Sequence, residues 1–255
     1  MANQSKQSDV EQMFNRIARR YDLANDLQSL FLHRYWKKKV KSLAAVSSNQ
    51  FALDICCGTG DIAFELAQTG ATVVGIDLSQ PMLEIAQFRI QKYNFPINRR
   101  LINSDYQSKQ CKRTGNVFFI KSNALNLPFK NNTFDTITIG YGLRNICNYN
   151  KALAEMFRAL KPGGRIVILE FGKPPNKLWN KIYFFHLKKI VPFLGKLIAK
   201  DWDAYFYIYE SLLKYPGQFV VDKTLKDLGG INTKIINIMA GAMTINYCEK
   251  PFKNQ

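Results

Sequence analysis

The stretch "LDICCGTGDIA", from Leu53 to Ala63, decides the fold of this chain. An apolar run ends in two glycines, Gly58 and Gly60, and a helical pattern follows at once. Glycine is needed where the backbone takes a positive φ or comes close to a ligand. A strand, a glycine turn and a helix in this order are typical of the first unit of a nucleotide-binding α/β sheet.

The pattern continues on both sides of this stretch. Apolar runs predict further strands at residues 71–79, 117–124, 133–141 and 165–172, and helical patterns separate most of them. "TKIINIM" and "AMTINYCEK" flank Ala240 and Gly241 and predict a closing hairpin. Strands that alternate with helices form a parallel sheet, so we expect an α/β fold with a doubly wound, mostly parallel, seven-stranded Rossmann-like sheet whose last strand is antiparallel.

Three regions differ from this alternation. Residues 1–9 are polar and are expected to form a disordered tail, and residues 10–45 carry interrupted helical patterns. Residues 172–224 are rich in aromatic residues and lysines and predict a helical insertion before the last strands, in which Pro192 is expected to break one helix in two. The main domain is therefore predicted to span residues 46–255.

The amino-acid composition limits the classes of partner and compartment that suit this chain. A net charge of +17 favours anionic surfaces, either nucleic acid or acidic lipid head groups, although a lysine-rich composition alone also accounts for it. The five cysteines lack metal-type CxxC spacing, so we expect buried thiols in a reducing compartment and no metal site. The polar start "MANQSKQSDVEQ" lacks the apolar core of a secretory signal, and no apolar run is long enough for a spanning helix.

Polar residues at the predicted strand ends point to an adenosine-type ligand. Asp77 ends the second strand, about twenty residues after the glycine turn, where a carboxylate binds ribose hydroxyls. Asp54 lies inside the first strand, where its charge suits a cationic amino group and a sulfonium and opposes a pyrophosphate. Asn123, with Ala124 beside it, is suited to hydrogen-bond an adenine edge. These residues favour S-adenosylmethionine over NAD and make a dehydrogenase the least favoured reading.

The sequence resembles the class I S-adenosylmethionine-dependent methyltransferases. Its closer likeness is to the quinone-biosynthesis C-methyltransferases, which methylate demethylmenaquinol or the 2-polyprenyl-methoxybenzoquinol precursor of ubiquinone. The likeness is carried by "YDLANDLQSLFLHRYW" (21–36), "LDICCGTGD" (53–61), "GYGLRN" (140–145) and "RALKPGGRIVILEFGKP" (158–174). It implies a methyltransferase domain over residues 46–255, with a helical lid over residues 10–45.

The resemblance also implies which residues bind the cofactor. They are Thr59, Asp77, Asn123, Ala124 and Gly140, to which the strand and glycine turn described above add Asp54, Gly58 and Gly60. The chain departs from the family at Ala24, where Met is usual, at Gly172, where Ser is frequent, and in a longer, more basic loop at residues 94–116. None of these departures removes a polar group that we assign to the chemistry.

The acceptor side of the predicted site lies around "GYGLRN". A quinol carbon becomes nucleophilic when a ring hydroxyl is deprotonated, so the enzyme needs a base or a cation that stabilises the phenolate. Arg144 cannot act as a base, but it can hold a phenolate directly or through water; the alternative is that it only pairs with loop carbonyls, Asp22 or Asp26. Tyr141 is expected to pack against the substrate ring or the cofactor.

The N-terminal segment supplies further candidates. His33 is one of two histidines and is a candidate general base, because histidine titrates near neutrality; the alternative is a structural role. Tyr21 and Asn25 share this segment and are predicted to contact substrate from the lid. A polyprenyl tail needs an apolar pocket that opens toward lipid, and residues 178–199 mix apolar side chains and lysines as an interfacial helix does.

The leading hypothesis is therefore a C-methyltransferase that converts demethylmenaquinol to menaquinol and lies in the cytoplasm at the inner face of an anionic membrane. The alternatives are a ubiquinone-pathway benzoquinol methyltransferase, an RNA methyltransferase and a non-catalytic scaffold that binds the cofactor. No nucleic-acid partner is expected, since the aromatic residues lie in an apolar insertion and not in a basic stacking groove. A homodimer is left open.

Overall fold

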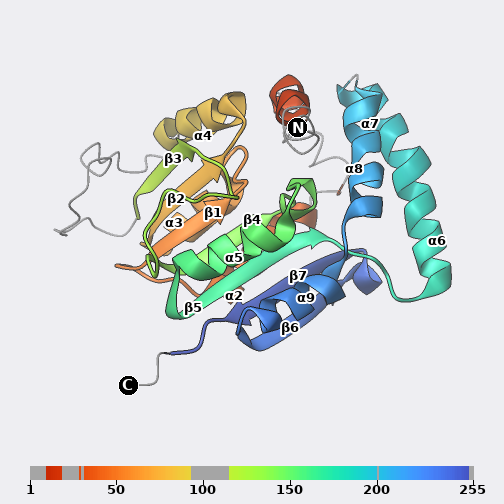
Figure 1. The fold of residues 1–255 in the computed structure, drawn as a ribbon. Coiled ribbons are helices and arrows are strands. Elements are labelled where there is room, and N and C mark those ends of the chain that lie inside the picture. The colour runs from red at the N-terminus through yellow and green to blue at the C-terminus, as the bar shows by residue number, and fades with distance from the viewer. Residues whose placement is uncertain (1–9, 19–28, 30–31, 93–114, 200, 253–255) are drawn as a thin grey trace.

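The computed structural model describes residues 10–18, 29, 32–92, 115–199 and 201–252. Its centre is a seven-stranded sheet in the order β3-β2-β1-β4-β5-β7-β6 (Figure 1). The predictions for residues 1–9, for Tyr21, Asn25, Asp22 and Asp26, and for most of the basic loop lie outside the described residues.

Five strands of the sheet are parallel. They are β1 (Phe51–Ile55), β2 (Thr72–Asp77), β3 (Val117–Lys121), β4 (Phe134–Gly140) and β5 (Leu160–Phe171). β1 lies between β2 and β4, so the direction of the strand order reverses beside β1. Open α/β sheets bind ligands at such a switch point, outside the carboxyl ends of the strands.

The last two strands close the sheet as an antiparallel hairpin. β6 (Ile231–Ile238) and β7 (Met243–Glu249) are joined by the short helix η4 (Met239–Gly241), and β7 lies between β5 and β6. The predicted hairpin and the antiparallel last strand are both confirmed.

Helices cover both faces of the sheet. Successive strand residues point to opposite faces, so Ala52 and Leu53 enter two separate apolar clusters. One cluster contains residues of α2 (Leu32–Ala44) and α3 (Asp61–Ala67), and the other contains residues of α5 (Tyr149–Ala159) and α9 (Gln218–Asp227). α4 (Gln80–Lys92) contributes Ile90 to the first cluster and Met82 to the second. The doubly wound arrangement is thus confirmed.

The insertion begins with one long helix. α6 (Lys177–Phe185), the π segment η3 (His186–Ile190) and α7 (Val191–Ala199) follow one another without a gap. The prediction that Pro192 breaks this helix is wrong. Pro192 lies directly after the π segment, where the hydrogen-bond pattern already changes, so its missing amide hydrogen does not interrupt a regular ladder. α8 (Trp202–Lys214) packs beside α7, and the two stand apart from the sheet in Figure 1.

The N-terminal region contributes two described helices with different surroundings. α2 packs against α3 and β5, with Trp36, Val40 and Ala44 buried in the sheet's apolar core. Residues 10–18 form a helix that lies between α4 and the insertion in Figure 1. Among the described residues, no helix has both the length and the apolar character needed to cross a bilayer.

Candidate active site

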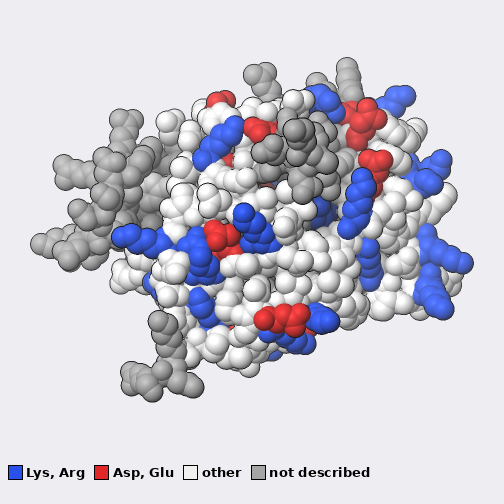
Figure 2. Space-filling model, viewed as in Figure 1, with Lys and Arg blue, Asp and Glu red and all other residues white. Residues whose placement is uncertain are grey.

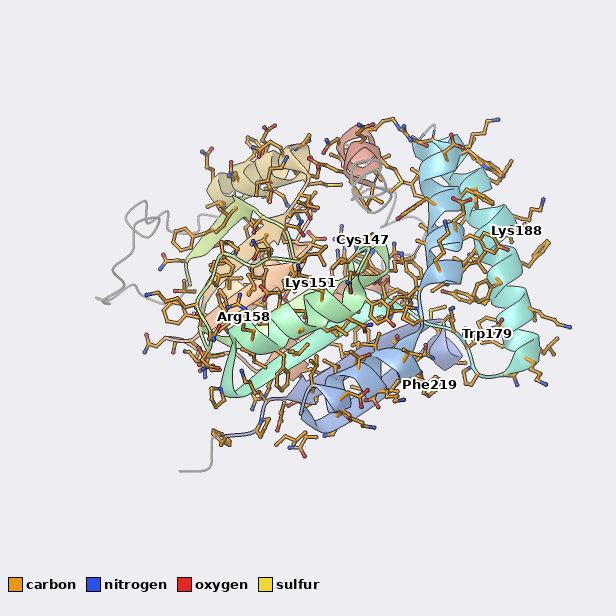
Figure 3. All side chains as sticks on the ribbon, viewed as in Figure 1. Cys147, Lys151, Arg158, Trp179, Lys188 and Phe219 are labelled. Atoms are coloured by element: carbon orange, nitrogen blue, oxygen red, sulfur yellow. The ribbon has the colours of Figure 1, made fainter. Side chains whose placement is uncertain are left out.

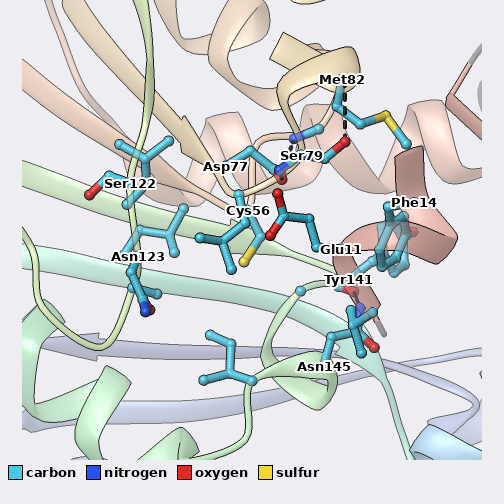
Figure 4. Close-up of a pocket in the computed structure, with 18 of the residues that line it drawn as sticks. Glu11, Phe14, Cys56, Asp77, Ser79, Met82, Ser122, Asn123, Tyr141 and Asn145 are labelled. Carbon is cyan, nitrogen blue, oxygen red and sulfur yellow. Dashed lines mark hydrogen bonds between the residues drawn. The ribbon is translucent and has the colours of Figure 1, made fainter. Parts of the chain in front are cut away.

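A cavity lies outside the carboxyl ends of β1, β2 and β4. Its walls come from the glycine loop, from the ends of the three strands and from the helix at residues 10–18. Figure 4 shows Ser122 and Asn123 on one side of this cavity and Phe14 and Tyr141 on the other. The cavity therefore occupies the position where a sheet of this type holds its ligand.

The glycine loop forms one edge of the cavity. Gly58 has a φ of +53°, lines the cavity and has open space where a Cβ atom would stand. Gly60, with a φ of +88°, precedes α3, and a Cβ atom there would collide with the rings of Phe119 and Phe64. Gly58 thus leaves room for a ligand, while Gly60 allows close packing behind the loop.

Thr59 lies away from the cavity. Its side chain is buried, and its carbonyl oxygen accepts a hydrogen bond from Arg89 Nη1 at 3.0 Å. Thr59 and Gly60 do not line the cavity, so a role for either in cofactor binding acts through the backbone of the loop.

Asp77 holds the glycine loop to the end of β2. Its Oδ2 accepts the backbone N–H of Gly58 at 2.9 Å, and its Oδ1 accepts that of Ser79 at 2.9 Å. Burial raises the pKa of Asp77, and these backbone hydrogen bonds only partly oppose it. Asp77 lines the cavity with a carboxylate fixed in direction, which suits a ligand that presents hydroxyl groups.

Three other predicted cofactor residues meet at the same cavity. Asn123 and Ala124 line it beyond β3, and Asn123 Oδ1 accepts the backbone N–H of Leu125 at 2.9 Å. Gly140 ends β4 and also lines the cavity, where a Cβ atom would meet the side chain of Ile62. The strand ends thus bring together residues that are more than eighty positions apart in the chain.

Asp54 does not line the cavity, although the next two residues, Ile55 and Cys56, do. It points to the face of the sheet covered by α2 and α3, where it is 1% exposed and its Oδ1 accepts the hydroxyl of Thr138 at 2.8 Å. Its Oδ2 has no hydrogen-bond partner among the described residues. Burial raises the pKa of Asp54 to about 7, although the Thr138 hydrogen bond and the charge of Lys37 oppose the rise.

A charged cluster lies close to Asp54. Lys37 Nζ is 2.5 Å from Asp61 Oδ2, and Arg89 Nη2 is 2.8 Å from Asp61 Oδ1. Burial alone would raise the pKa of Asp61, but these two cations lower it to about 2. The cluster joins α2, α3 and α4 around the start of the glycine-loop helix.

The sequence did not reveal several residues of this cavity. Ser122, Asn145 and Cys147 line it, as do Glu11 and Phe14 from the helix at residues 10–18.

Side-chain contacts to distant parts of the chain hold the helix at residues 10–18 in place. Asn15 Oδ1 accepts the hydroxyl of Ser79, Glu11 pairs with Lys121, and Arg16 pairs with Asp201. Contacts between such distant positions leave no signal in a single sequence.

A second, larger cavity adjoins the first. It has a volume of about 310 Å³ and lies between the insertion, α2 and the loop after β4. Two predicted site residues from different motifs line it together: His33 from α2 and Arg144 from the loop after β4. Tyr141 and Phe14 line both cavities and therefore form the partition between them.

Tyr141 holds this position with a strained backbone. Its φ is +60°, which is unusual for a residue with a bulky side chain, and its N–H donates to the carbonyl oxygen of Leu169 at 2.8 Å. Its ring packs against Phe171 at a centroid distance of 5.6 Å. Strain of this kind persists only where the surrounding structure imposes it, and it is frequent at functional sites.

Arg144 is paired with a carboxylate that the sequence analysis missed. Its Nη1 lies 2.5 Å from Glu170 Oε1, and its backbone N–H donates to Glu170 Oε2 at 3.1 Å. The guanidinium also donates to the carbonyl oxygen of Tyr141 at 2.6 Å and stacks over the ring of Phe171 at 4.8 Å. Glu170 was recognisable as the one charge inside the apolar run "IVILEF".

A hydrogen bond to Ser29 orients the ring of His33 within the second cavity. Its ring is 6% exposed, and Nδ1 lies 2.7 Å from Ser29 Oγ. The ring therefore has a defined orientation at the cavity wall, on a helix that the sheet core anchors.

Comparison with known proteins decides the family. A model of the ubiE/COQ5 methyltransferase family matches residues 2–250. This chain belongs to the ubiE/COQ5 methyltransferase family.

Full-length relatives agree with this assignment. The ubiE/COQ5 family chain is 37% identical over 246 residues to the ubiquinone/menaquinone biosynthesis C-methyltransferase UbiE of Francisella tularensis subsp. holarctica, covering 95% of this chain and 91% of that one. It is 36% identical over 251 residues to the UbiE protein of Cellvibrio japonicus, covering 97% and 94%.

Solved structures share the fold at low sequence identity. A methyltransferase from Thermotoga maritima described as SAM-dependent superposes with a TM-score of 0.61 at 18% identity, covering 94% of this chain and 98% of that one. The phosphoethanolamine N-methyltransferase 2 of Haemonchus contortus, solved in complex with S-adenosyl-L-methionine, gives a TM-score of 0.57 at 18% identity, covering 85% and 52%.

The ubiE/COQ5 family chain is thus an S-adenosylmethionine-dependent methyltransferase. The residues present fit this cofactor. The first cavity offers open space beside Gly58 and a fixed carboxylate at Asp77. Asp54, whose Oδ2 is unpartnered among the described residues, directly precedes Ile55 and Cys56 of the cavity wall. A cation close to Asp54 would offset the cost of leaving that carboxylate buried.

Proposed function

We propose that this protein methylates a ring carbon of a polyprenylated quinol, and that its acceptor is demethylmenaquinol, which becomes menaquinol. The observation that carries the proposal is the pair of adjoining cavities with Tyr141 between them. One cavity has polar groups suited to the cofactor, and the other has an aromatic and aliphatic wall suited to a quinol. The names of the UbiE relatives support the same class of acceptor.

Bound S-adenosylmethionine supplies an electrophilic methyl group, and the other requirements fall on the protein. Asp77, Asn123, Ala124 and Gly140 are proposed to hold the cofactor at the strand ends, with Gly58 leaving room beside it. Asp54 is proposed to interact with its positive charge. The helix at residues 10–18 lines the first cavity and is proposed to act as a lid that keeps water out of it.

The second cavity suits a flat aromatic acceptor. Trp36, Tyr141, Phe171 and Tyr183 contribute ring surfaces to it. Aromatic pairs prefer offset or edge-to-face contacts, and a fused bicyclic ring presents more area for them than a single ring. This area is our reason to favour the naphthoquinol over the benzoquinol.

His33 is proposed to remove the proton from the quinol. The new carbon–carbon bond leaves the ring with one proton too many, so the reaction needs a group that accepts a proton near neutral pH. His33 is buried in the acceptor cavity and is held by Ser29, which orients it for this role. A positioned base of this kind accelerates proton transfer by about 10²- to 10⁴-fold.

Arg144 is proposed to bind the quinol oxygen as a rigid donor. Its charge is compensated by Glu170, so it acts through the fixed direction of its N–H groups and less as an isolated cation. The bonds to Glu170 and to the Tyr141 carbonyl keep the guanidinium in the cavity wall. Tyr21 and Asn25 remain proposed substrate contacts.

Transfer of a labelled methyl group tests the proposal. The protein is incubated with methyl-labelled S-adenosylmethionine and, separately, with a demethylnaphthoquinol, a benzoquinol precursor and bulk RNA. We expect label in the naphthoquinol, and we expect His33→Asn to reduce turnover by about 10²-fold or more with cofactor affinity unchanged.

Three results would contradict this proposal. Label only in the benzoquinol would assign the other quinone pathway, and label only in RNA would remove the quinol altogether. Cofactor binding without transfer to any acceptor would indicate a scaffold. An unchanged turnover in His33→Asn would remove His33 from the chemistry while leaving the acceptor assignment intact.

A further inference from the structure

The long helix of the insertion exposes a stripe of large apolar side chains. Leu178, Ile182, Phe185, Phe193 and Leu197 form this stripe, which we call the α6–α7 face. Their exposed fractions are 69%, 51%, 61%, 61% and 70%, respectively. Single exposed apolar residues are normal on soluble proteins, but a continuous patch usually marks an interaction surface.

The π segment is what keeps the stripe on one side of the helix. Each α-helical residue turns the chain by about 100°, so Phe193, eight residues after Phe185, would lie about 80° off the stripe in a regular helix. A π turn contains one extra residue, which rotates everything after it back by about 100°. Phe193 and Leu197 therefore return to the side of Leu178 and Phe185.

Lysines surround this stripe. Residues 177–199 contain five lysines and no acidic residue. These lysines are exposed, and within the described part of the chain none of them pairs with a carboxylate; they are Lys177, Lys181, Lys188, Lys189 and Lys196. Lys188 lies over the ring of Tyr209 at 5.7 Å. Figure 2 shows the basic side chains along the edge of the molecule formed by α6 and α7.

The α6–α7 face is continuous with the second cavity. Ile182 belongs to both, because it is half exposed and also lines the cavity. Trp179 and Met239 line the cavity beside it, and Trp179 Nε1 donates a hydrogen bond to the Met239 carbonyl oxygen at 3.1 Å. Met239 is itself 50% exposed. The mouth of the cavity thus opens between α6 and η4, next to the stripe.

We propose that the α6–α7 face docks onto an anionic lipid surface and that the quinol enters the second cavity from that surface. The entry of the quinol rests on the proposed function, whereas the docking does not. Interfacial helices bury an apolar face at the boundary of head groups and acyl chains and keep lysines in the head-group layer. Each lysine near an anionic leaflet adds electrostatic attraction to it.

A second copy of the chain is a less suitable occupant of this face. A two-fold dimer places the same surface of both copies in contact, so five lysines would meet five lysines. Like charges oppose each other across such an interface, and the α6–α7 helix offers no carboxylate to compensate them.

Vesicle binding tests the proposal. Binding is measured by sedimentation with vesicles of phosphatidylcholine alone and of phosphatidylcholine mixed equally with phosphatidylglycerol. We expect the protein to bind the mixed vesicles and to release them as salt screens the lysines. The double variant Phe185→Ser and Phe193→Ser is expected to lower the partition coefficient by at least about tenfold, because two phenyl rings no longer enter the apolar layer.

A matched double variant controls for general loss of apolar surface. Phe88 on α4 and Phe219 on α9 are 68% and 56% exposed and do not belong to the α6–α7 face, and Figure 3 shows Phe219 well apart from Lys188. Phe88→Ser with Phe219→Ser is expected to change the partition coefficient by less than about twofold. Circular dichroism and thermal unfolding check that both double variants fold.

The outcomes separate docking from catalysis. Phe185 and Phe193 do not line the second cavity, so their double variant should methylate a short-tailed, water-dispersed quinol at the rate of the unchanged protein. No binding to mixed vesicles, or equal loss in both double variants, would overturn the docking proposal. A dimer that only the Phe185/Phe193 variant dissociates, without vesicle binding, would assign the face to a second copy. Vesicle binding without methyl transfer to any quinol would contradict the proposed function alone.

Discussion

At the scale of single residues, Asp54 makes the stability of the folded protein depend on pH. Its folded pKa of about 7 lies well above the ordinary value of 3.8. Between these two values the folded, cofactor-free protein binds a proton that the unfolded chain does not. The stability contributed by Asp54 is therefore greatest below pH 4 and falls as the pH rises toward 7.

Cofactor binding should show the opposite dependence on pH. An ammonium group near Asp54 favours the carboxylate, so we expect the affinity for S-adenosylhomocysteine, which has this group but no sulfonium, to rise by up to about tenfold per pH unit as the pH approaches 7 from below. Isothermal titration calorimetry measures this change. The Asp54→Asn variant controls for titration of the ligand's own amino group, and its affinity should be lower and depend less on pH. A profile identical in both proteins would show that Asp54 does not interact with the cofactor.

The Arg144–Glu170 pair should contribute strongly to stability. Both side chains are almost fully buried, so Arg144→Ala leaves the Glu170 carboxylate without its ionic partner. Loss of one partner of a buried pair costs about 3–5 kcal/mol in the free energy of unfolding, whereas a well-packed apolar replacement of both is often neutral. We therefore expect Arg144→Met with Glu170→Leu to recover most of the stability lost in Arg144→Ala, as measured by denaturant unfolding.

An exposed ion pair provides the comparison for this measurement. Lys226 and Asp222 lie one helical turn apart at 2.7 Å, with the lysine side chain largely in solvent. Lys226→Ala is expected to cost no more than about 1 kcal/mol. If Arg144→Ala unfolds at the same denaturant concentration as Lys226→Ala, the buried pair does not stabilise the loop after β4.

At the scale of elements, the sequence predicted the strands well because each buried strand is a short apolar run. β2, β3 and β4 lie within the predicted ranges. β5 begins earlier than expected, at Leu160, because Leu160 pairs with Phe134 ahead of an irregularity in the ladder. Such pairing depends on the neighbouring strand and not on local composition.

The helices were less predictable because their surroundings decide their roles. The pattern around Pro192 indicated a break, but the π segment before it absorbs the change in hydrogen bonding. α2 shares the N-terminal segment with the proposed lid, yet it packs in the sheet core. Of the N-terminal residues that the structure describes, those at 10–18 line the first cavity, and the sequence contained no sign of their contacts with Ser79, Lys121 and Asp201.

The candidate site was predictable where it follows from topology. Asp77, Asn123 and Gly140 were expected at the strand ends, and the sheet brings them to one cavity. The position of the Asp54 side chain was harder to predict from the sequence. Alternation along β1 turns it to the opposite face of the sheet from Leu53 and Ile55. The pairing of Arg144 with Glu170 joins a loop to the adjacent strand and required the three-dimensional structure.

At the scale of the whole molecule, two adjoining cavities and one exposed face form a continuous path. The first cavity lies at the switch point of the sheet, Tyr141 and Phe14 separate it from the second, and the second opens beside the α6–α7 face. Residues 177–199, which form this helix, contribute five lysines and no acidic residue to the net charge of +17. The arrangement accounts for how one protein can meet a water-soluble cofactor and a lipid-soluble acceptor.

A crystal structure with S-adenosylhomocysteine and a short-tailed demethylnaphthoquinone tests this arrangement most directly. We expect the ribose hydroxyls at Asp77, the quinone ring between His33 and Arg144, and Tyr141 beside the gap between the two molecules. The tail should leave the cavity past Trp179 and Ile182 toward the α6–α7 face. A ring bound outside the second cavity, or on the far side of Tyr141 from His33, would contradict the account.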